Sequence, residues 1–398
     1  MRVLMLSWEY PPHVVGGLGK HVADLVPALA RLDVAIDLVT PLRGGDAEIA
    51  SVPRTTVHRV AYEAPGWGGF YDEVRAANQR LEAFCDELIV NSGPFDLIHN
   101  HDWLTAFAAI ALKNKYRLPL VGTIHATERG RGRGSLNGEQ AERINDAEWR
   151  LIYESWRVIC CAQFMAAELD AYFQTPTDKI DVIPNGVDPS HFLALEGQDL
   201  SELRARYARP EEKLVLYVGR LVYEKGIEVL VRAAPLVLAQ VPQAKFVIAG
   251  KGPELERMRE LVRSMGLADK VYLPGFVSDE DRDRLYKLAD CAVFPSLYEP
   301  FGIVALEAMA AGAPVVVSEV GGLKEVVRHG ETGITVYPGD AASCAWGIVH
   351  TLVEPQWAEQ RVQNAWREVL DRFNWETIAR QTADVYTRVV EERLRTDW

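Results

Sequence analysis

The sequence has few cysteines, no excess of positive charge and no long apolar run. Five cysteines occur in 398 residues, and only Cys160 and Cys161 lie close together, which gives neither a disulfide framework nor a set of metal ligands. The formal net charge of −13 argues against nucleic acid or an anionic membrane as the partner of a broad surface. Because the chain lacks 18 consecutive apolar residues, we expect no stable membrane insertion.

The remaining composition suits a protein with ordinary cores. Apolar residues make up 48% of the chain and charged residues 25%. A length of 398 residues predicts two domains rather than one. The N-terminus reaches Trp8 and Glu9 too early for a signal-peptide core, and Cys160 and Cys161 are expected to be buried thiols. These features favour a reducing compartment, so we expect a cytoplasmic protein.

Strand and helix patterns alternate along the whole chain, which is typical of α/β domains with parallel sheets. Each half opens with a short apolar strand, a loop containing glycine and an amphipathic helix. The expected strands are 2–7, 35–40, 95–99, 118–125, 158–161 and 181–183 in the first half, and 213–219, 245–249, 270–273, 291–294 and 314–318 in the second. A strong turn at Pro184–Pro189 separates the halves.

We therefore predict two doubly wound, Rossmann-like domains that face a central cleft at the carboxyl ends of their strands. The first covers residues 1–190 and the second residues 191–373. A last helix, within residues 374–398, keeps its apolar positions on one face and follows a capping Asn374.

Two glutamates separated by seven residues, Glu299 and Glu307, stand out in the second half. Glu299 lies on a loop, and Glu307 lies about one turn into a helix predicted over 303–311. The N–H groups at the start of this helix form an expected anion site; they belong to Phe301, Gly302 and Ile303. For two glutamates alone, the simpler interpretation is a helix with an acidic start and one solvated side chain.

Two further loops offer ligand-binding groups. Gly16 and Gly17 precede a helix, where a backbone without side chains can approach a ligand closely, although a plain tight turn is an equal alternative. Arg220 and Lys225 follow a strand, and a guanidinium fork with an ammonium group suits a diphosphate. A solvated turn with a Glu224–Lys225 pair explains the same residues.

Histidines end two of the predicted strands. His99, His101 and Asp102 follow one strand, and His125 ends another. This pattern invites a metal-site hypothesis, but no second cluster of ligands accompanies it, and a hydrogen-bonded strand end is the alternative. The Asp-x-Asp pattern within 279–283 is better explained as a charged helix start than as a Mg²⁺ site. We expect no metal.

Taken in order, these motifs resemble the retaining GT-B glycosyltransferases of family four. The second half carries that group's nucleotide-sugar motifs, and the first half is similar to glycogen and starch synthases and their short relatives. The motifs are Arg220…Lys225, Gly250–Pro253 and Glu299…Glu307 in the second half, and Ser7–Pro12, Gly16–Leu18, His99–Trp103 and Thr123–His125 in the first. The closing segment Phe373–Ala379 also resembles that group and implies a return to the first, acceptor-side domain.

The resemblance implies roles for the candidate residues. His125 contacts the transferred sugar, Asp102 lies near the acceptor or the donor sugar, and Glu299 binds the sugar hydroxyls. Arg220 and Lys225 hold the diphosphate, Gly16 and Gly17 face a donor phosphate, and Glu307 binds the ribose. The implied catalytic set is His125, Asp102 and Glu299, and the implied donor-binding set is Gly16, Gly17, Arg220, Lys225, Phe301, Gly302, Ile303 and Glu307.

The implied activity is transfer of glucose, with retention, from ADP-glucose or UDP-glucose to a growing α-1,4-glucan, without a metal cofactor. A family-four transferase with another acceptor is the nearest alternative: glucose 1-phosphate, a sugar phosphate or a lipid. A metal-dependent hydrolase using His99, His101 and Asp102 is the alternative of another class, and a nucleotide-sugar-binding protein without turnover is a third. The chain departs from the long bacterial glycogen synthases by having Val14 and Val15, rather than Lys-Thr, before its paired glycines.

Overall fold

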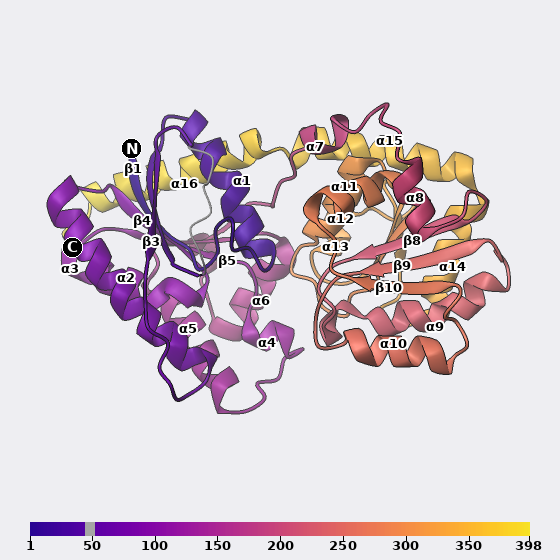
Figure 1. Ribbon diagram of the computed structural model, residues 1–398. Helices are drawn as coiled ribbons and strands as arrows, with labels where there is room; N and C mark the ends of the chain where they lie inside the picture. Colours follow the sequence, from indigo (N-terminus) through magenta and orange to yellow (C-terminus); the bar gives the residue numbers. More distant parts are fainter. Residues whose placement is uncertain (44–51) are drawn as a thin grey trace. The chain divides into compact units, whose positions relative to one another are not determined.

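The computed structural model describes residues 1–43 and 52–398, and the chain forms two compact units (Figure 1). The N-terminal unit comprises Met1–Asn185 together with Trp375–Trp398, and the C-terminal unit comprises Gly186–Asn374. The sequence-based boundary lay between residues 190 and 191, and the observed division falls between 185 and 186. Each unit contains one parallel sheet.

The sheet of the N-terminal unit has seven strands in the order β3-β2-β1-β4-β5-β6-β7. Most residues of its inner strands are buried, because helices cover a parallel sheet on both faces. The direction of winding reverses between β1 and β4, and ligands of such sheets bind outside the carboxyl ends of the strands at this point. The strands are β1 Arg2–Leu6, β2 Ala35–Pro41, β3 Thr55–Val60, β4 Leu97–His101, β5 Leu120–Ile124, β6 Arg157–Cys160 and β7 Ile180–Val182.

The last helix of the chain belongs to the N-terminal unit. Its residues Ile378, Val385 and Tyr386 share a buried core with Leu25 and Leu29 of the first helix. Among the described residues, no helix is both long and apolar enough to span a bilayer. The helices of this unit are α1 Gly17–Arg31, α2 Phe70–Ser92, η1 Trp103–Thr105, α3 Ala106–Tyr116, α4 Glu128–Arg131, α5 Glu139–Glu154, α6 Gln163–Phe173, η2 Thr177–Lys179 and α16 Trp375–Leu394.

The C-terminal unit repeats this plan with six strands in the order β10-β9-β8-β11-β12-β13, and its switch point lies between β8 and β11. The strands are β8 Lys213–Val218, β9 Ala244–Ala249, β10 Val271–Gly275, β11 Cys291–Phe294, β12 Val315–Ser318 and β13 Ile334–Val336. The helices are α7 Ser190–Leu193, α8 Ser201–Tyr207, η3 Tyr223–Lys225, α9 Ile227–Leu238, α10 Leu255–Ser264, α11 Asp279–Leu288, α12 Ile303–Ala311, α13 Leu323–Val326, α14 Ala341–Val353 and α15 Pro355–Arg372.

The structure confirms two doubly wound sheets and differs from the sequence-based expectations at their edges. The edge strands β3 and β13 were not predicted, because β3 is only partly buried and β13 is three residues long, so neither forms a clear apolar run. The basic segment 129–134 begins inside the short helix α4, which the Thr127 hydroxyl caps by accepting the Gly130 N–H. The five cysteines are buried free thiols, as predicted for Cys160 and Cys161.

Candidate functional site

In the C-terminal unit, the loop after β8 and the loop after β11 lie against each other. A side chain at Gly226 would place its Cβ 2.0 Å from the carbonyl oxygen of Pro295, so only glycine permits this approach. The approach brings Lys225 to Glu299, whose Nζ and Oε2 atoms are 2.6 Å apart. Both side chains are largely buried, which makes this a strongly coupled ion pair.

Glu299 is held in place through both its carboxylate and its backbone. Besides the Lys225 ammonium group, the Ser296 hydroxyl lies 3.5 Å from Oε2, and the Gly322 N–H donates to the backbone carbonyl of Glu299 at 3.0 Å. A carboxylate that is held in this way can accept hydrogen bonds from a ligand without first being ordered.

Helix α12 begins beside Glu299. Gly302 adopts φ of 110°, and a Cβ there would lie 2.5 Å from a methyl carbon of Leu323, so this turn requires glycine. Neither a side-chain cap nor an acidic residue is found at the first turn of α12, which starts at Ile303. Phe301 is buried and its ring packs against Phe373. The N-terminus of α12 therefore presents positive helix-dipole charge, and the first turn carries no acidic residue of its own.

Glu307 lies on α12 in a buried network. Its carboxylate accepts the Tyr286 hydroxyl at 3.3 Å and lies near the Arg282 guanidinium. Burial, together with the negative charge of Glu307, raises the pKa of Tyr286 well above its usual value, so the phenol stays protonated and remains a donor. Arg282 also pairs with Asp279 and Asp283 at 2.7 and 2.8 Å. The acidic segment 279–283 is therefore the start of helix α11, where Arg282 forms ion pairs with two of the aspartates.

Arg220 is the more accessible of the two predicted diphosphate ligands. Its side chain is 49% exposed, and its pairing with Glu224 is long, at 3.7 Å. Lys225, in contrast, is 16% exposed and occupied by Glu299. Arg220 is therefore accessible to an incoming anion, whereas the Lys225 ammonium group is already paired with Glu299.

In the N-terminal unit, three histidines meet at the carboxyl ends of the central strands. His101 ends β4, His125 directly follows β5, and His21 lies on α1. His101 Nδ1 and His125 Nε2 are 3.1 Å apart, and the rings of His21 and His125 are in edge contact at a centroid distance of 4.7 Å. Burial lowers the pKa of both His21 and His125 to about 3, so these imidazoles are neutral at neutral pH.

His99 takes no part in this cluster as a ligand. Its Nδ1 lies 2.6 Å from the Tyr386 hydroxyl, and its Nε2 lies 2.7 Å from the Thr123 hydroxyl, so both ring nitrogens are occupied. Asp102 is also hydrogen-bonded, because its Oδ1 accepts the backbone N–H of His125 at 2.7 Å. The geometry favours the hydrogen-bonded strand end over a metal set made of His99, His101 and Asp102.

A second buried carboxyl, Glu148 of α5, accompanies Asp102. Burial raises the pKa of Asp102 to about 6. The nearby charge of Arg131 and the hydrogen bond from the backbone N–H of His125 both lower this pKa, but burial has the larger effect. Burial raises the pKa of Glu148 to about 8, again against Arg131, and the charge of Asp102 adds to the rise. The Glu148 carboxyl accepts the Glu128 N–H, and this bond positions the start of α4, which carries Arg131.

The glycine loop before α1 is held by Glu9. Its Oε2 accepts the N–H groups of Val15 and Gly16 at 2.8 and 3.1 Å. A Cβ at Gly19 would lie 2.7 Å from that oxygen, whereas a Cβ at Gly16 would meet no atom within 4 Å. Gly16 is extended, with φ of −157°, so neither strain nor crowding in the protein requires a glycine there. Gly17 is the first residue of α1.

Several residues near the candidate positions were not identified from the sequence. Glu148 faces the buried side of α5, and a glutamate at a core-facing helical position was a usable signal. His21 had no such signal, because its partner Asn185 lies 164 positions away in the sequence. The residues that were missed are Glu9, His21, Arg131, Glu148, Arg282 and Tyr286.

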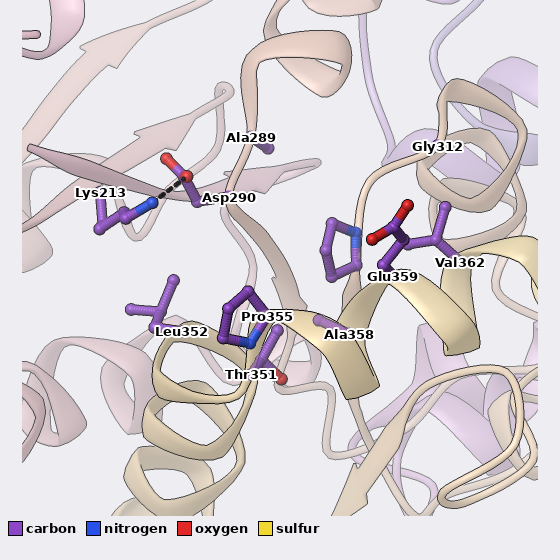
Figure 2. A pocket seen from close by; sticks show the side chains of 11 residues that line it. Lys213, Ala289, Asp290, Gly312, Thr351, Leu352, Pro355, Ala358, Glu359 and Val362 are labelled. Carbon is purple, nitrogen blue, oxygen red and sulfur yellow. Dashed lines mark hydrogen bonds and ion pairs between the residues drawn. The ribbon is translucent and has the colours of Figure 1, made fainter.

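A cavity of about 310 Å³ lies at the amino-terminal ends of the strands of the C-terminal sheet (Figure 2). Its wall includes Lys213 at the start of β8 and Asp290 just before β11, which form an ion pair of 3.2 Å. Pro314 precedes β12 and also lines the cavity. Because these residues precede the strands, the cavity is separate from Arg220, Lys225 and Glu299, which follow them.

Comparison with known proteins agrees with this architecture. The model of "Glycosyltransferase Family 4" matches residues 15–191, and that of "Glycosyl transferases group 1" matches residues 200–368. An uncharacterized glycosyltransferase of Methanocaldococcus jannaschii is 40% identical over 98% of this chain and 99% of its own length. A glycogen synthase of Mycobacterium tuberculosis is 36% identical over 97% of this chain and 94% of its own length.

A solved structure extends the similarity to three dimensions. Sucrose-phosphate synthase from Thermosynechococcus elongatus superimposes with a TM-score of 0.84 at 28% identity, covering 98% of this chain and 99% of that one. Both family models and full-length relatives thus agree with the resemblance found in the sequence motifs. The chain belongs to the GT-B glycosyltransferases of family four.

Proposed function

We propose that this glycosyltransferase moves glucose, with retention of configuration, from ADP-glucose or UDP-glucose to a growing α-1,4-glucan. The observation that carries the proposal is the buried Lys225–Glu299 pair beside the uncapped start of α12. Cationic and dipolar groups suit a diphosphate leaving group, and a fixed carboxylate suits sugar hydroxyls. The similarity to a glycogen synthase supports glucan as the acceptor.

In this proposal the C-terminal unit binds the donor. Arg220 and the N–H groups around Phe301, Gly302 and Ile303 receive the diphosphate, and Lys225 lies between the diphosphate and Glu299. Negative charge grows on the leaving phosphate as the bond to the sugar breaks, so groups already oriented there stabilise the transition state. Glu307, on the next turn of α12, accepts the ribose hydroxyls. These groups supply positive charge without a metal.

The N-terminal unit contributes the neutral His125 and the glycine loop. A neutral imidazole can exchange a hydrogen bond with a hydroxyl of the transferred sugar, and Asp102 holds the backbone of His125 in place by accepting its backbone N–H. Gly16 and Gly17 face a donor phosphate. His125 is not a nucleophile in this scheme.

The chemical step proceeds on one face of the sugar. The bond from the anomeric carbon to the phosphate oxygen breaks through an oxocarbenium-like state, and the acceptor hydroxyl oxygen forms the new bond on the same face. The acceptor proton passes to the leaving phosphate oxygen, so the products are the lengthened glucan and a nucleoside diphosphate.

The test is a matrix of donors and acceptors with purified protein, in the presence and absence of EDTA. ADP-glucose and UDP-glucose are each combined with glycogen, glucose 1-phosphate and fructose 6-phosphate, and nucleoside diphosphate release is measured. We expect release that depends on glycogen, survives EDTA and gives an α-linked product by NMR. If nucleoside diphosphate is released only with a sugar phosphate, the acceptor is a sugar phosphate and not a glucan. The similarity to a sucrose-phosphate synthase makes a sugar phosphate the second candidate acceptor. Activity that requires added Mg²⁺ or Zn²⁺ would contradict the metal-free donor site.

A further inference from the structure

The cluster of His21, His101 and His125 contains more hydrogen-bonding capacity than its surroundings use. Each histidine offers one ring nitrogen such that the three atoms lie within 4.8 Å of one another. Nε2 of His21 and Nε2 of His101 are buried and have no hydrogen-bond partner among the described residues. Buried polar atoms without partners are rare in folded proteins, and they mark places where a ligand or ion completes the structure.

The orientation of His21 is that of a supported metal ligand. Its Nδ1 lies 2.6 Å from Oδ1 of the buried Asn185, an acceptor, so Nδ1 carries the proton. The lone pair is therefore on Nε2, the atom without a partner. Metal-bound histidines are fixed in this way, with the second ring nitrogen donating to an oxygen.

The spacing is close to that of a tetrahedral site. Zn–N bonds of about 2.0–2.1 Å place two ligand nitrogens about 3.4 Å apart. The ligand nitrogens of His21, His101 and His125 lie within 4.8 Å of one another, so each pair needs to contract by at most about 1.4 Å. His125 is only partly buried, which leaves a side open for a fourth ligand such as water.

We propose that His21, His101 and His125 form a binding site for one divalent transition-metal ion with borderline-soft character, such as Zn²⁺. Three neutral imidazoles suit Zn²⁺, Co²⁺, Ni²⁺ and Cu²⁺ far better than Mg²⁺ or Ca²⁺, which prefer oxygen. An ion bound to the His125 ring prevents that ring from contacting the sugar, so the ion inhibits transfer. This inhibition rests on the proposed function, in which His125 contacts the sugar.

Binding is measured on the full chain without any donor, by calorimetric titration with ZnCl₂ and by the absorption of added Co²⁺. We expect one ion per chain and Co²⁺ bands of tetrahedral intensity. His21→Gln and His101→Gln should each weaken Zn²⁺ binding at least about tenfold, and Asn185→Ala about tenfold through loss of the second-shell bond. His191→Gln, at an exposed histidine outside the cluster, is the matched control and should bind as the wild type does.

Imidazole ¹H–¹⁵N spectra of the wild-type protein test the site without any substitution. One equivalent of Zn²⁺ should shift the resonances of three rings, which single-histidine variants assign to His21, His101 and His125. The site would be overturned by a lack of stoichiometric binding, by shifts of other rings, or by wild-type affinity in both His21→Gln and His101→Gln.

Measurements of turnover with and without Zn²⁺ test the metal site and the proposed function independently. Zn²⁺ should inhibit the wild type, and EDTA should restore activity. Stoichiometric binding without inhibition would keep the metal site and refute the role of His125 in transfer. Absence of any transferase activity would refute the proposed function, while the calorimetric result would still decide the metal site.

Discussion

The two units share one sheet plan but treat polar groups at the ends of their strands in opposite ways. In the C-terminal unit, charges are kept and paired: Lys225 with Glu299, and Arg282 with Asp279 and Asp283. In the N-terminal unit, burial shifts pKa values toward neutral forms, with His125 lowered to about 3 and Glu148 raised to about 8. The same fold therefore supports an ionic environment in one unit and a largely uncharged one in the other.

This difference fits the two tasks of the proposed reaction. A diphosphate leaving group carries and gains negative charge, so its binding groups need charge of their own. A sugar ring is neutral and is recognised by hydrogen bonds, which a neutral imidazole such as that of His125 can exchange. The comparison predicts that charge-removing substitutions act strongly in the C-terminal unit, whereas the N-terminal unit responds to pH.

The largest effect is expected for Lys225→Ala. It leaves Glu299 buried without its counter-ion, and breaking a buried ion pair by removing one partner costs about 3–5 kcal/mol of stability. We expect a lower melting temperature in calorimetry and strongly reduced turnover. The double variant Lys225→Met/Glu299→Gln is the control, because it removes both charges and should recover much of the stability but not the turnover. A single variant as stable as the wild type would contradict the paired-charge description.

Arg220→Ala should separate catalysis from stability. The side chain is half exposed and weakly paired, so the melting temperature should change little. Loss of one charged contact to the leaving group should lower kcat by roughly 30- to 1,000-fold, which corresponds to about 2–4 kcal/mol. Arg232→Ala, at an exposed arginine on α9 that pairs within its own helix, is the matched control. Near-wild-type turnover of Arg220→Ala would show that the diphosphate binds elsewhere.

Glu148 makes the N-terminal unit sensitive to pH. Its pKa rises from a usual 4.5 to about 8 on folding, so the unfolded chain releases this proton at lower pH than the folded chain does. The contribution of the protonated carboxyl to stability is complete below pH 4.5 and is lost as the pH rises toward 8, with a slope of at most about 1.4 kcal/mol per pH unit.

Glu148→Gln should remove this slope. Glutamine keeps the size of the carboxyl and cannot ionise, so the variant should become more stable than the wild type as the pH approaches 8. Chemical unfolding at pH 5, 6, 7 and 8 measures the difference. Glu142→Gln, at an exposed glutamate on the same helix, is the matched control. Parallel pH profiles for the Glu148 variant and the wild type would show that Glu148 is ionised in the folded protein.

Much of this architecture was predictable from the sequence, because it depends on local patterns. Helix α12 was predicted with its observed bounds, since its apolar run starts after Gly302 and stops at Gly312. Partners that are distant in sequence were not predictable in the same way. Tyr386 reaches His99 across 287 positions, and Asn185 reaches His21 across 164. The candidate donor-binding residues were chosen from motifs whose members are close together in sequence, whereas the His21 cluster depends on where α1 lies on the sheet.

The smallest effect is expected at the glycine loop, and it tests whether a ligand approaches there. Gly16→Ala places a methyl group in open space on an extended backbone, so the protein should be as stable as before or more stable by about 0.4–1 kcal/mol. If a donor phosphate approaches this loop, the methyl group should still weaken nucleotide-sugar binding by about 1 kcal/mol, or roughly fivefold in Kd. Gly19→Ala is the contrasting variant, because its Cβ would meet Glu9, so it should lose stability as well as affinity. Calorimetry with ADP-glucose and UDP-glucose, alongside thermal unfolding, measures both quantities. Unchanged affinity in Gly16→Ala would mean that this glycine faces solvent in the complex, and that the donor phosphates depend on the C-terminal unit alone.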